Sequence, residues 1–355
     1  MHTLRILPDL RSSVVESMPA GQELLFTSRR TDADAALLAR PDVRPFTWRA
    51  LRHALRDPDL EVLEVAEPLW LGEWRRAVRC IAAAKAVRVL RRRPVAVATY
   101  AIENADARER LPTRAGRLRL GLSLLLLDAI VFGTTGASEN YLRTFGWALR
   151  RVRHTVLTPQ LDACSVCPPT TAPREPVVLF LGTPSERKGF PTLMRAWELT
   201  GAADRGWRLV VADPSGAASG DLPAAVSVTV DPPRPAVHEL LRTSAVVAMP
   251  SVRRPGWREQ IGLPLVEGLT HGCRVVTTPE TGLAPDLLDH PLVFFTEPGD
   301  AESLADGLRR AMDGRSGVTS GPPGHTKTDV VAWWRASENA LATREPCHAE
   351  LRRTR

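Results

Sequence analysis

Two glutamates separated by seven residues, Glu259 and Glu267, flank the stretch of the chain best suited to chemistry. Between them, Gly262 and Pro264 predict a helix start, because proline suits a first helical turn and glycine lets backbone approach a ligand closely. A helix start offers free N–H groups and the positive end of the helix dipole, which together bind phosphate. Glu267, about one turn into this helix, would accept hydrogen bonds from two neighbouring hydroxyls, such as those of a ribose. Glu259 would lie in the preceding loop, near whatever group is attached beyond the phosphates.

A second loop, within Leu181–Phe190, carries cations after a predicted strand. Lys188 in this loop, next to Arg187, is a point charge suited to a diphosphate. Both loops are predicted to follow strands of one sheet, and such sheets bind ligands outside the carboxyl ends of their strands. The alternatives remain open at this point: Glu267 complements the helix dipole, Glu259 is solvated, and Lys188 lies in an ordinary surface loop.

The elements that would position these loops form an alternating pattern. Short apolar and β-branched runs are separated by helical patterns, which is typical of parallel sheets covered on both faces. The first half shows this alternation more faintly, and no Gly-x-Gly-x-x-Gly motif occurs. The predicted strands are 177–183, 207–213, 226–231, 244–251 and 273–279 in the second half, and 3–9, 60–66 and 94–100 in the first half, where 126–146 predicts strand, turn and helix.

The basic excess of the chain belongs to its first half. Residues 1–170 hold 26 Lys and Arg against 18 Asp and Glu, whereas residues 171–355 hold 21 against 22. Such a charge attracts phosphorylated substrates, anionic membrane surfaces or nucleic acid. Trp74–Pro94 contains eight basic residues and no acidic one. Two interpretations of this segment stay open: peripheral contact with a membrane, and a solvated helix face. No nucleic-acid module accompanies the charge, and we expect no nucleic-acid partner.

The five cysteines are an odd, sparse set, which suits reduced thiols in a cytoplasmic protein. Cys164 and Cys167 have the spacing of a redox or metal pair. They lie in a Pro-rich connector, however, and no second such pair or histidine pair is recognisable to complete a zinc site. We therefore interpret them as linker residues and expect no metal site.

No secretory signal or membrane span is recognisable in the sequence. The most apolar run, Gly121–Ala137, is interrupted by Asp128 and is shorter than the roughly 20 residues that a span requires. We expect a cytoplasmic protein, with membrane association through its basic first half as the alternative.

Four segments of the second half resemble, in order and spacing, the C-terminal half of retaining, nucleotide-sugar-dependent glycosyltransferases of the GT-B fold, of the family four or group one type. Glu259 and Glu267 match the glutamate pair of that family. The resemblance covers about residues 177–313, and its segments are Leu181–Trp197, Ser244–Ser251, Glu259–Leu288 and Pro298–Met312.

This resemblance implies a role for each matching residue. Glu267 would bind the ribose, Glu259 would contact and orient the donor sugar, and Lys188 would hold the diphosphate. Gly262 and Leu263 would offer backbone N–H groups to sugar or phosphate. The implied reaction transfers a sugar with retention and without a metal or cofactor, because Lys188 and the helix start stabilise the leaving diphosphate.

The chain also departs from the family pattern. Thr183 stands where the family usually has arginine, and Arg187 or Arg258 are candidates to compensate. The first half resembles the family only in outline and lacks the usual glycine pair in its first loop. These departures leave two alternatives open: an inactive nucleotide-binding homologue that acts as a partner protein, and a nucleotide-sugar epimerase.

On the acceptor side, no histidine lies where the family often places one. Tyr100, Glu103 and Asn104 follow the predicted strand there and are the candidates. Glu103 is a candidate general base, with a structural or acceptor-binding role as the alternative.

We therefore expect two Rossmann-like domains with parallel sheets facing across a cleft. The expected parts are an acceptor domain at 1–165, a linker at 166–176 and a nucleotide-sugar domain at 177–325. Residues 326–355 would form a C-terminal helix that packs back across the domains, followed by a disordered tail. The acceptor would be a small molecule, a glycan or a lipid-linked molecule. The nucleotide base, the sugar and the oligomeric state are not specified by the sequence.

Overall fold

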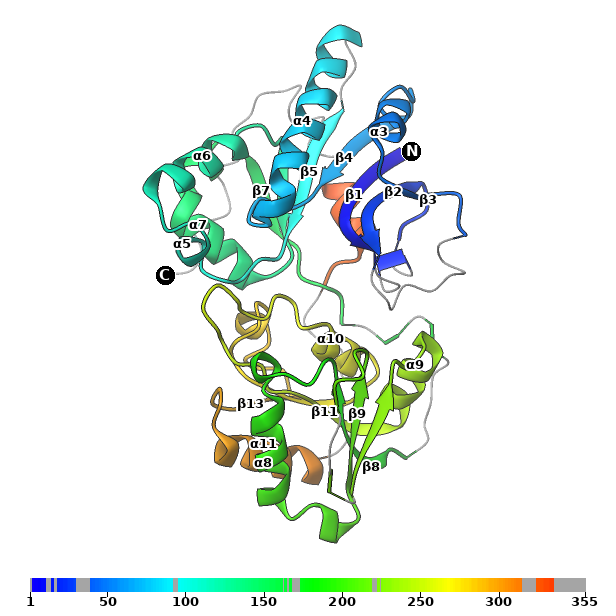
Figure 1. Ribbon diagram of the computed structural model, residues 1–355, viewed down its shortest axis with the longest axis vertical. Helices are drawn as coiled ribbons and strands as arrows, with labels where there is room; N and C mark the ends of the chain where they lie inside the picture. Colours follow the sequence, from blue (N-terminus) through cyan, green and yellow to red (C-terminus); the bar gives the residue numbers. More distant parts are fainter. Residues whose placement is uncertain are drawn as a thin grey trace.

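The computed structural model describes residues 2–10, 14–15, 18–29, 39–91, 95–161, 163–164, 166–167, 173–218, 222–223, 225–314 and 324–334. They form two α/β domains stacked along the long axis of the molecule (Figure 1). Each domain has its own parallel sheet, and helices pack against the sheets.

The first domain is built on a seven-stranded sheet in the order β3-β2-β1-β4-β5-β6-β7. All of its strand pairs are parallel. Its strands are β1 (His2–Leu10), β2 (Gln22–Arg29), β3 (Val43–Pro45), β4 (Leu60–Val65), β5 (Ala96–Ala101), β6 (Ala129–Phe132) and β7 (Arg153–Val156), and its helices are α3 (Trp48–Ala54), α4 (Leu71–Arg91), α5 (Ala107–Arg110), α6 (Arg114–Leu124) and α7 (Thr135–Leu149).

The second domain is built on a six-stranded parallel sheet in the order β10-β9-β8-β11-β12-β13. Strand order reverses between β8 and β11, and ligands in open α/β sheets bind at the carboxyl ends beside such a reversal. Its strands are β8 (Glu175–Leu181), β9 (Arg208–Asp213), β10 (Val226–Val230), β11 (Ser244–Met249), β12 (Arg274–Thr277) and β13 (Val293–Phe295); its helices are α8 (Phe190–Thr200), α9 (Arg234–Thr243), α10 (Leu263–Thr270) and α11 (Ala301–Asp313), with short 3-10 turns η1 (Glu186–Lys188), η2 (Ala203–Arg205) and η3 (Ala284–Asp286).

The continuous apolar runs of the second half become central strands covered on both faces. Every residue of β11 and β12 is buried. One core cluster includes side chains of α8 and α11, and another includes side chains of α9 and α10. The strands that lead into the loops are therefore packed between helices.

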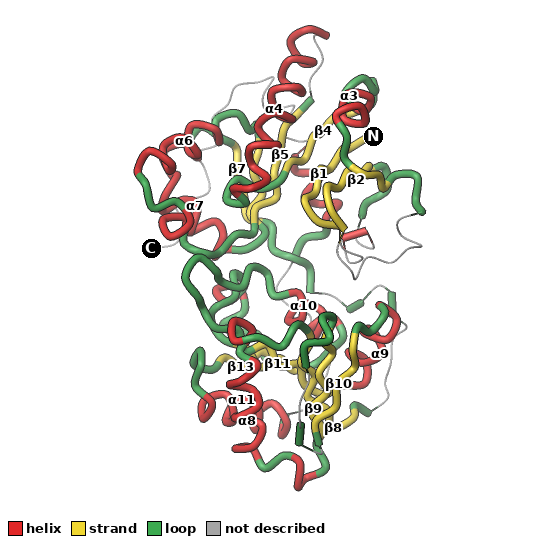
Figure 2. Tube along the Cα trace, in the orientation of Figure 1, coloured by secondary structure: helices red, strands yellow, loops and turns green. Residues whose placement is uncertain are grey.

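The strand arrows of Figure 1 show that the carboxyl edges of the two sheets face each other. Loops lie between these edges (Figure 2). At the start of α7, directly after β6, Thr135 Oγ1 donates to Asp286 Oδ1 at 2.5 Å. The N–H of Gly136 donates to the carbonyl of Gly282 at 3.1 Å. The segments that follow strands in one domain thus touch the segments that follow strands in the other.

Of the expected C-terminal helix, the structure describes residues 327–334. Val331 and Trp334 pack on the sheet of the first domain. Lys327 pairs with Glu64 of β4 at 2.9 Å, and burial, together with the charge of Arg5, lowers the pKa of Lys327 to about 7. The chain therefore returns from the second domain to cover the first. The expected disordered tail from 335 onwards lies outside the described residues.

Helix α4 contains most of the basic stretch Trp74–Pro94. Its buried side chains recur at helical spacing (Trp74, Ala77, Cys80, Ile81 and Ala84). Lys85, which interrupts the apolar pattern, pairs with Asp128 at 2.6 Å, and Arg88 reaches the same carboxylate at 3.5 Å. Among the described helices, none combines the length and apolar character that crossing a bilayer requires.

Candidate active site

Lys188 and Glu259 meet where the strand order of the second sheet reverses. Lys188 lies in η1 after β8, and Glu259 lies in the loop between β11 and α10, residues 250–262, called here the β11–α10 loop. Lys188 Nζ is 2.5 Å from Glu259 Oε2, and Ser251 Oγ donates to the same oxygen at 3.0 Å. The lysine and glutamate side chains are only 17% and 11% exposed. The structure thus confines a cation and a carboxylate together at this edge.

Gly189 explains how Lys188 comes so close to the end of β11. Its φ of 69° favours glycine, and a Cβ there would lie 1.9 Å from the carbonyl oxygen of Pro250. The N–H of Val252 also donates to the carbonyl of Arg187 at 2.9 Å. The two loops are therefore joined through their backbones.

Helix α10 begins beside this pair, with Pro264 in its first turn as the sequence predicts. Gly262 has a φ of 77°, and a Cβ there would lie 2.7 Å from Met249 Cε. Within the described part of the chain, the N–H groups of Gly262 and Leu263 have no hydrogen-bond acceptor. Free N–H groups at a helix start suit an anion, and these follow closely in the chain on Glu259, the partner of Lys188.

Glu267 lies further along α10 and faces α9. Its Oε1 is 2.8 Å from NH1 of Arg234, and the two side chains are 16% and 22% exposed. Arg234, which the sequence analysis missed, stands at the start of α9. A carboxylate held in this way keeps lone pairs for hydroxyl donors.

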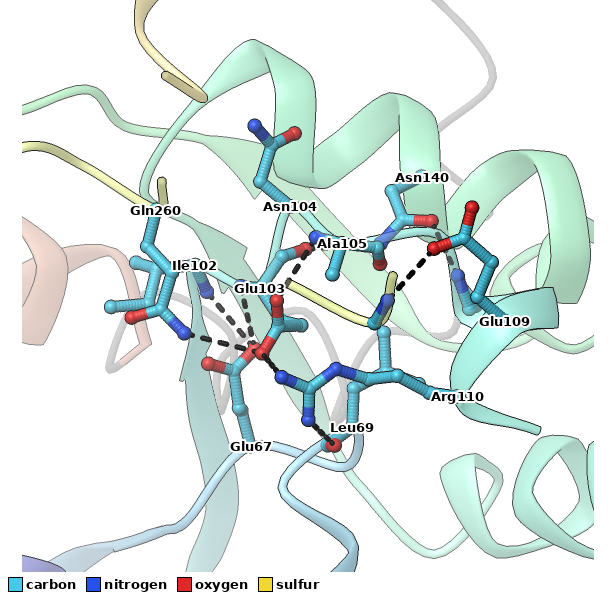
Figure 3. A network of polar contacts seen from close by, with 12 residues as sticks. Glu67, Leu69, Ile102, Glu103, Asn104, Ala105, Glu109, Arg110, Asn140 and Gln260 are labelled. Carbon is cyan, nitrogen blue, oxygen red and sulfur yellow. Dashed lines mark hydrogen bonds and ion pairs between the residues drawn. The ribbon is translucent and has the colours of Figure 1, made fainter. Parts of the chain in front are cut away.

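The acceptor-side candidates Glu103 and Asn104 contact the β11–α10 loop across the domain interface. Asn104 Nδ2 donates to the carbonyl of Glu259 at 3.1 Å. Gln260 Nε2 donates to Glu103 Oε2 at 3.2 Å, and Arg110 pairs with the same oxygen at 2.8 Å. Figure 3 shows Gln260 and Arg110 reaching the Glu103 carboxylate from two sides. Glu103, only 1% exposed, is thus arranged to position the loop.

A further carboxyl group, Glu67, lies beneath Glu103 and was not singled out from the sequence (Figure 3). Its Oε2 accepts hydrogen bonds from the N–H groups of Ile102 and Glu103 at 3.1 and 3.0 Å and from the hydroxyl of Tyr141 at 3.2 Å. Burial, and then the neighbouring Glu103 carboxylate, raise the pKa of Glu67 to about 8. Glu67 therefore holds the turn that carries Glu103.

The remaining candidates lie outside this network. The ring of Tyr100 packs against Lys327, whose Nζ is 4.5 Å from its centroid, and burial raises the pKa of Tyr100. Thr183 is half-buried after β8, and its carbonyl accepts a long hydrogen bond from Ser185 Oγ at 3.4 Å.

The two arginines considered as substitutes at position 183 are engaged elsewhere. The exposed Arg187 stacks over the ring of Trp257 at 4.8 Å. Arg258 pairs with Glu280 at 2.6 Å. In this structure neither guanidinium joins the pair formed by Lys188 and Glu259.

The expectation that no histidine pair accompanies Cys164 and Cys167 is wrong. His238, in α9, and His271, at the end of α10, lie beside them, and the four candidate ligand atoms all lie within 4.8 Å of one another. The histidines are distant in sequence from the cysteines and from each other, so no local sequence motif contains them. The four side chains come together only in the folded chain.

Comparison with known proteins agrees with this architecture. Residues 169–318 match the sequence model of the family described as Glycosyl transferases group 1. No curated protein matches the chain in sequence. The predicted resemblance is thus confirmed in the second domain.

Solved structures resemble the whole chain. A glycosyltransferase from Rickettsia africae is 12% identical, with a TM-score of 0.58 over 87% of this chain and 88% of that one. HepE from Anabaena, solved with UDP-glucose, is 13% identical, with a TM-score of 0.60 over 97% and 95%. A UDP-forming α,α-trehalose-phosphate synthase from Burkholderia xenovorans is 14% identical, with a TM-score of 0.58 over 96% and 98%. At such identities the likeness concerns the fold, and it confirms the predicted GT-B fold.

Proposed function

We propose that the protein transfers a sugar from a nucleotide-diphosphate sugar to an acceptor, with retention of anomeric configuration and without a metal ion at the diphosphate. The observation that carries this proposal is the pairing of Lys188 with Glu259, in the loop that leads directly into α10, at the strand-order reversal of the second sheet. The cation and the free N–H groups there suit the diphosphate of such a donor, and the carboxylate suits the hydroxyls of its sugar.

Lys188 is paired with Glu259 in this structure, so this ion pair would have to break when the donor binds. Lys188 would then pair with the diphosphate, and the carboxylate of Glu259 would accept hydrogen bonds from the hydroxyls of the donor sugar. Glu267 would accept hydrogen bonds from the ribose while Arg234 holds it in place. As the bond to the sugar breaks, Lys188 and the N–H groups of α10 would stabilise the growing charge on the diphosphate, a preorganised electrostatic effect.

The first domain would bind the acceptor and also align the donor loop. Asn104 and Glu103 hold the backbone of Glu259 and the side chain of Gln260. Glu103 has a positioning role in this proposal, because its oxygens already accept from Ala105 N–H, Arg110 and Gln260.

The structural neighbours suggest where a substrate search should begin. HepE was solved with UDP-glucose, and a Burkholderia xenovorans trehalose-phosphate synthase was solved with glucose-6-phosphate. We infer that a uridine diphosphate sugar is the first donor to test, with sugars and sugar phosphates as the first acceptors.

A lipid-linked acceptor is also compatible with the first domain. Near the end of α4, Val89 and Leu90 are 76% and 82% exposed next to the basic residues of this helix. Apolar and basic side chains together favour an anionic membrane surface. Sedimentation with phosphatidylserine vesicles tests this partner: a Val89→Asp, Leu90→Asp variant should lose binding, and equal binding by both proteins would contradict it.

The test of the function is transfer itself. The protein is incubated with UDP-, GDP-, ADP- and TDP-sugars and an acceptor panel, nucleoside diphosphate release is followed, and the new anomeric linkage is assigned by NMR. We expect one donor to be consumed only when acceptor is present, and Glu259→Gln to abolish transfer. Donor conversion without acceptor would indicate an epimerase, and nucleotide binding without turnover would indicate an inactive homologue.

A further inference from the structure

Four side chains outside the proposed active site converge between the linker and the second domain: Cys164, Cys167, His238 and His271, called here the Cys2His2 cluster. Cys167 Sγ is 3.4 Å from His238 Nδ1 and 3.4 Å from His271 Nε2. Cys164 Sγ is 3.8 Å from His238 Nδ1, and the two imidazole nitrogens are 3.1 Å apart.

These four separations are close to those of a tetrahedral metal site. Zinc binds sulfur at about 2.3 Å and imidazole nitrogen at about 2.0–2.1 Å, so neighbouring ligand atoms around it lie about 3.8 Å apart for two sulfurs, about 3.6 Å for sulfur and nitrogen, and about 3.3 Å for two nitrogens. We propose that the Cys2His2 cluster binds a zinc ion. Two cysteines and two histidines fill all four positions, which defines a structural site rather than a catalytic one.

The surroundings of the cluster orient one histidine for this role. His271 Nδ1 lies 2.7 Å from the carbonyl oxygen of Glu267, to which it donates when it carries the ring proton. That bond leaves the lone pair of Nε2 facing the cysteines, the arrangement usual for metal-binding histidines. His238 presents Nδ1, and zinc ligation there places a proton on its Nε2. Zinc binding would therefore end the 3.3 Å contact between Arg234 NH2 and His238 Nε2.

The Cys2His2 cluster lies where α9, α10 and the linker meet, so a bound ion would join these three segments. Helices α9 and α10 are linked twice: Arg234 contacts Glu267, and His238 contacts His271 four residues further along each helix. The segment that leads into the linker is attached to the same helix end, because the N–H of Cys164 donates to the carbonyl of Thr270 at 2.9 Å. Zinc would thus fasten the linker to the second domain and set where inter-domain movement can begin. It would also hold Glu267 by fixing the helix that carries it.

Zinc binding can be tested without any substrate, so its outcome is independent of the proposed transfer reaction. The full chain is purified, loaded with zinc and freed of excess metal, and zinc is then counted by mass spectrometry. We expect one zinc per chain in the natural protein and in Cys80→Ala, which removes a buried cysteine elsewhere in the fold. We expect none in the Cys164→Ser, Cys167→Ser double variant and a large loss in His271→Asn.

Cobalt substitution of the natural protein keeps the test decisive even if a variant fails to fold. Cobalt bound by two thiolates and two imidazoles in a tetrahedron gives intense visible bands and a thiolate charge-transfer band. Absence of these bands, zinc retained undiminished by the double variant, or a Cys164–Cys167 disulfide in the protein isolated under reducing conditions would each overturn the proposal.

Discussion

Lys188→Ala and Glu259→Gln should change the binding of a nucleoside diphosphate in opposite directions. In the free protein the two side chains are paired at 2.5 Å, so the diphosphate must compete with Glu259 for the lysine. Lys188→Ala removes a charged contact worth about 1.5–3 kcal/mol, which corresponds to binding about 10–150-fold weaker. Glu259→Gln removes the carboxylate that competes with the diphosphate for Lys188, so binding should tighten. Nothing is lost in exchange, because a nucleoside diphosphate lacks the sugar that Glu259 would contact.

The gain in the Glu259→Gln variant follows from the setting of the ion pair. With side chains 17% and 11% exposed, the pair is more shielded than a surface pair, for which 0–1 kcal/mol is usual. We therefore expect binding to tighten by about 1 kcal/mol, roughly fivefold, while sugar transfer is lost.

Isothermal titration calorimetry measures both changes, with Glu186→Gln as the control. Glu186 lies in the same loop but is 78% exposed and paired with Arg254, so its loss should leave the affinity unchanged. The Lys188→Ala, Glu259→Gln double variant should behave as Lys188→Ala alone, because no lysine remains to be released. If Glu259→Gln weakened binding as much as Lys188→Ala does, the exchange of partners would be refuted.

Three further predictions follow from other contacts of the site. Arg234→Met removes the partner of Glu267 and should weaken nucleotide binding by about 1 kcal/mol, seen in calorimetry as roughly fivefold; an unchanged affinity would show that Glu267 needs no support. Asn104→Ala removes the bond to the carbonyl of Glu259 and should lower the free energy of unfolding in urea by about 1–2 kcal/mol and reduce kcat; transfer at the normal rate would contradict a positioning role. The pKa of Glu67 is raised from 4.5 to about 8, so the folded protein binds more protons than the unfolded chain within that window and loses stability as the pH rises through it. Urea unfolding at pH 5 and pH 8 should show a loss of up to about 4 kcal/mol that Glu67→Gln abolishes, and an equal loss in both proteins would exclude Glu67 as its source.

The second domain could be predicted from sequence because its signals are local. Its strands are continuous apolar runs, and the five predicted there all occur, whereas β13 (Val293–Phe295), only three residues long and half-buried, was missed. Pro264 at the start of α10 and the pairing of Lys188 with a loop from the same edge follow from turn chemistry and sheet topology. In the first domain, β2, β3 and β7 were missed; β2 ends in exposed residues and no residue of β7 is fully buried, so neither is a continuous buried run.

The contacts that complete the site depend on packing between distant segments. Arg234 reaches Glu267 from another helix, and Gln260 reaches Glu103 from another domain. The histidines of the Cys2His2 cluster come from helices 74 and 104 residues away from their cysteine contacts. Spacing along the chain does not indicate these contacts, because they form only when α9, α10 and the linker pack together and when the two domains meet. The resemblance to a known family did not supply them either, because the roles it implies concern only Lys188, Glu259, Gly262, Leu263 and Glu267.

The most direct test of the central claim is calorimetric titration of the natural protein with UDP, GDP, ADP and TDP, beside Glu267→Ala and Lys188→Ala. The account predicts tight binding of one nucleotide, weakened in each variant by about 1–3 kcal/mol for lost charged hydrogen bonds. Binding of none of the four, or binding that both variants retain in full, would contradict a donor site at the carboxyl edge of the second sheet.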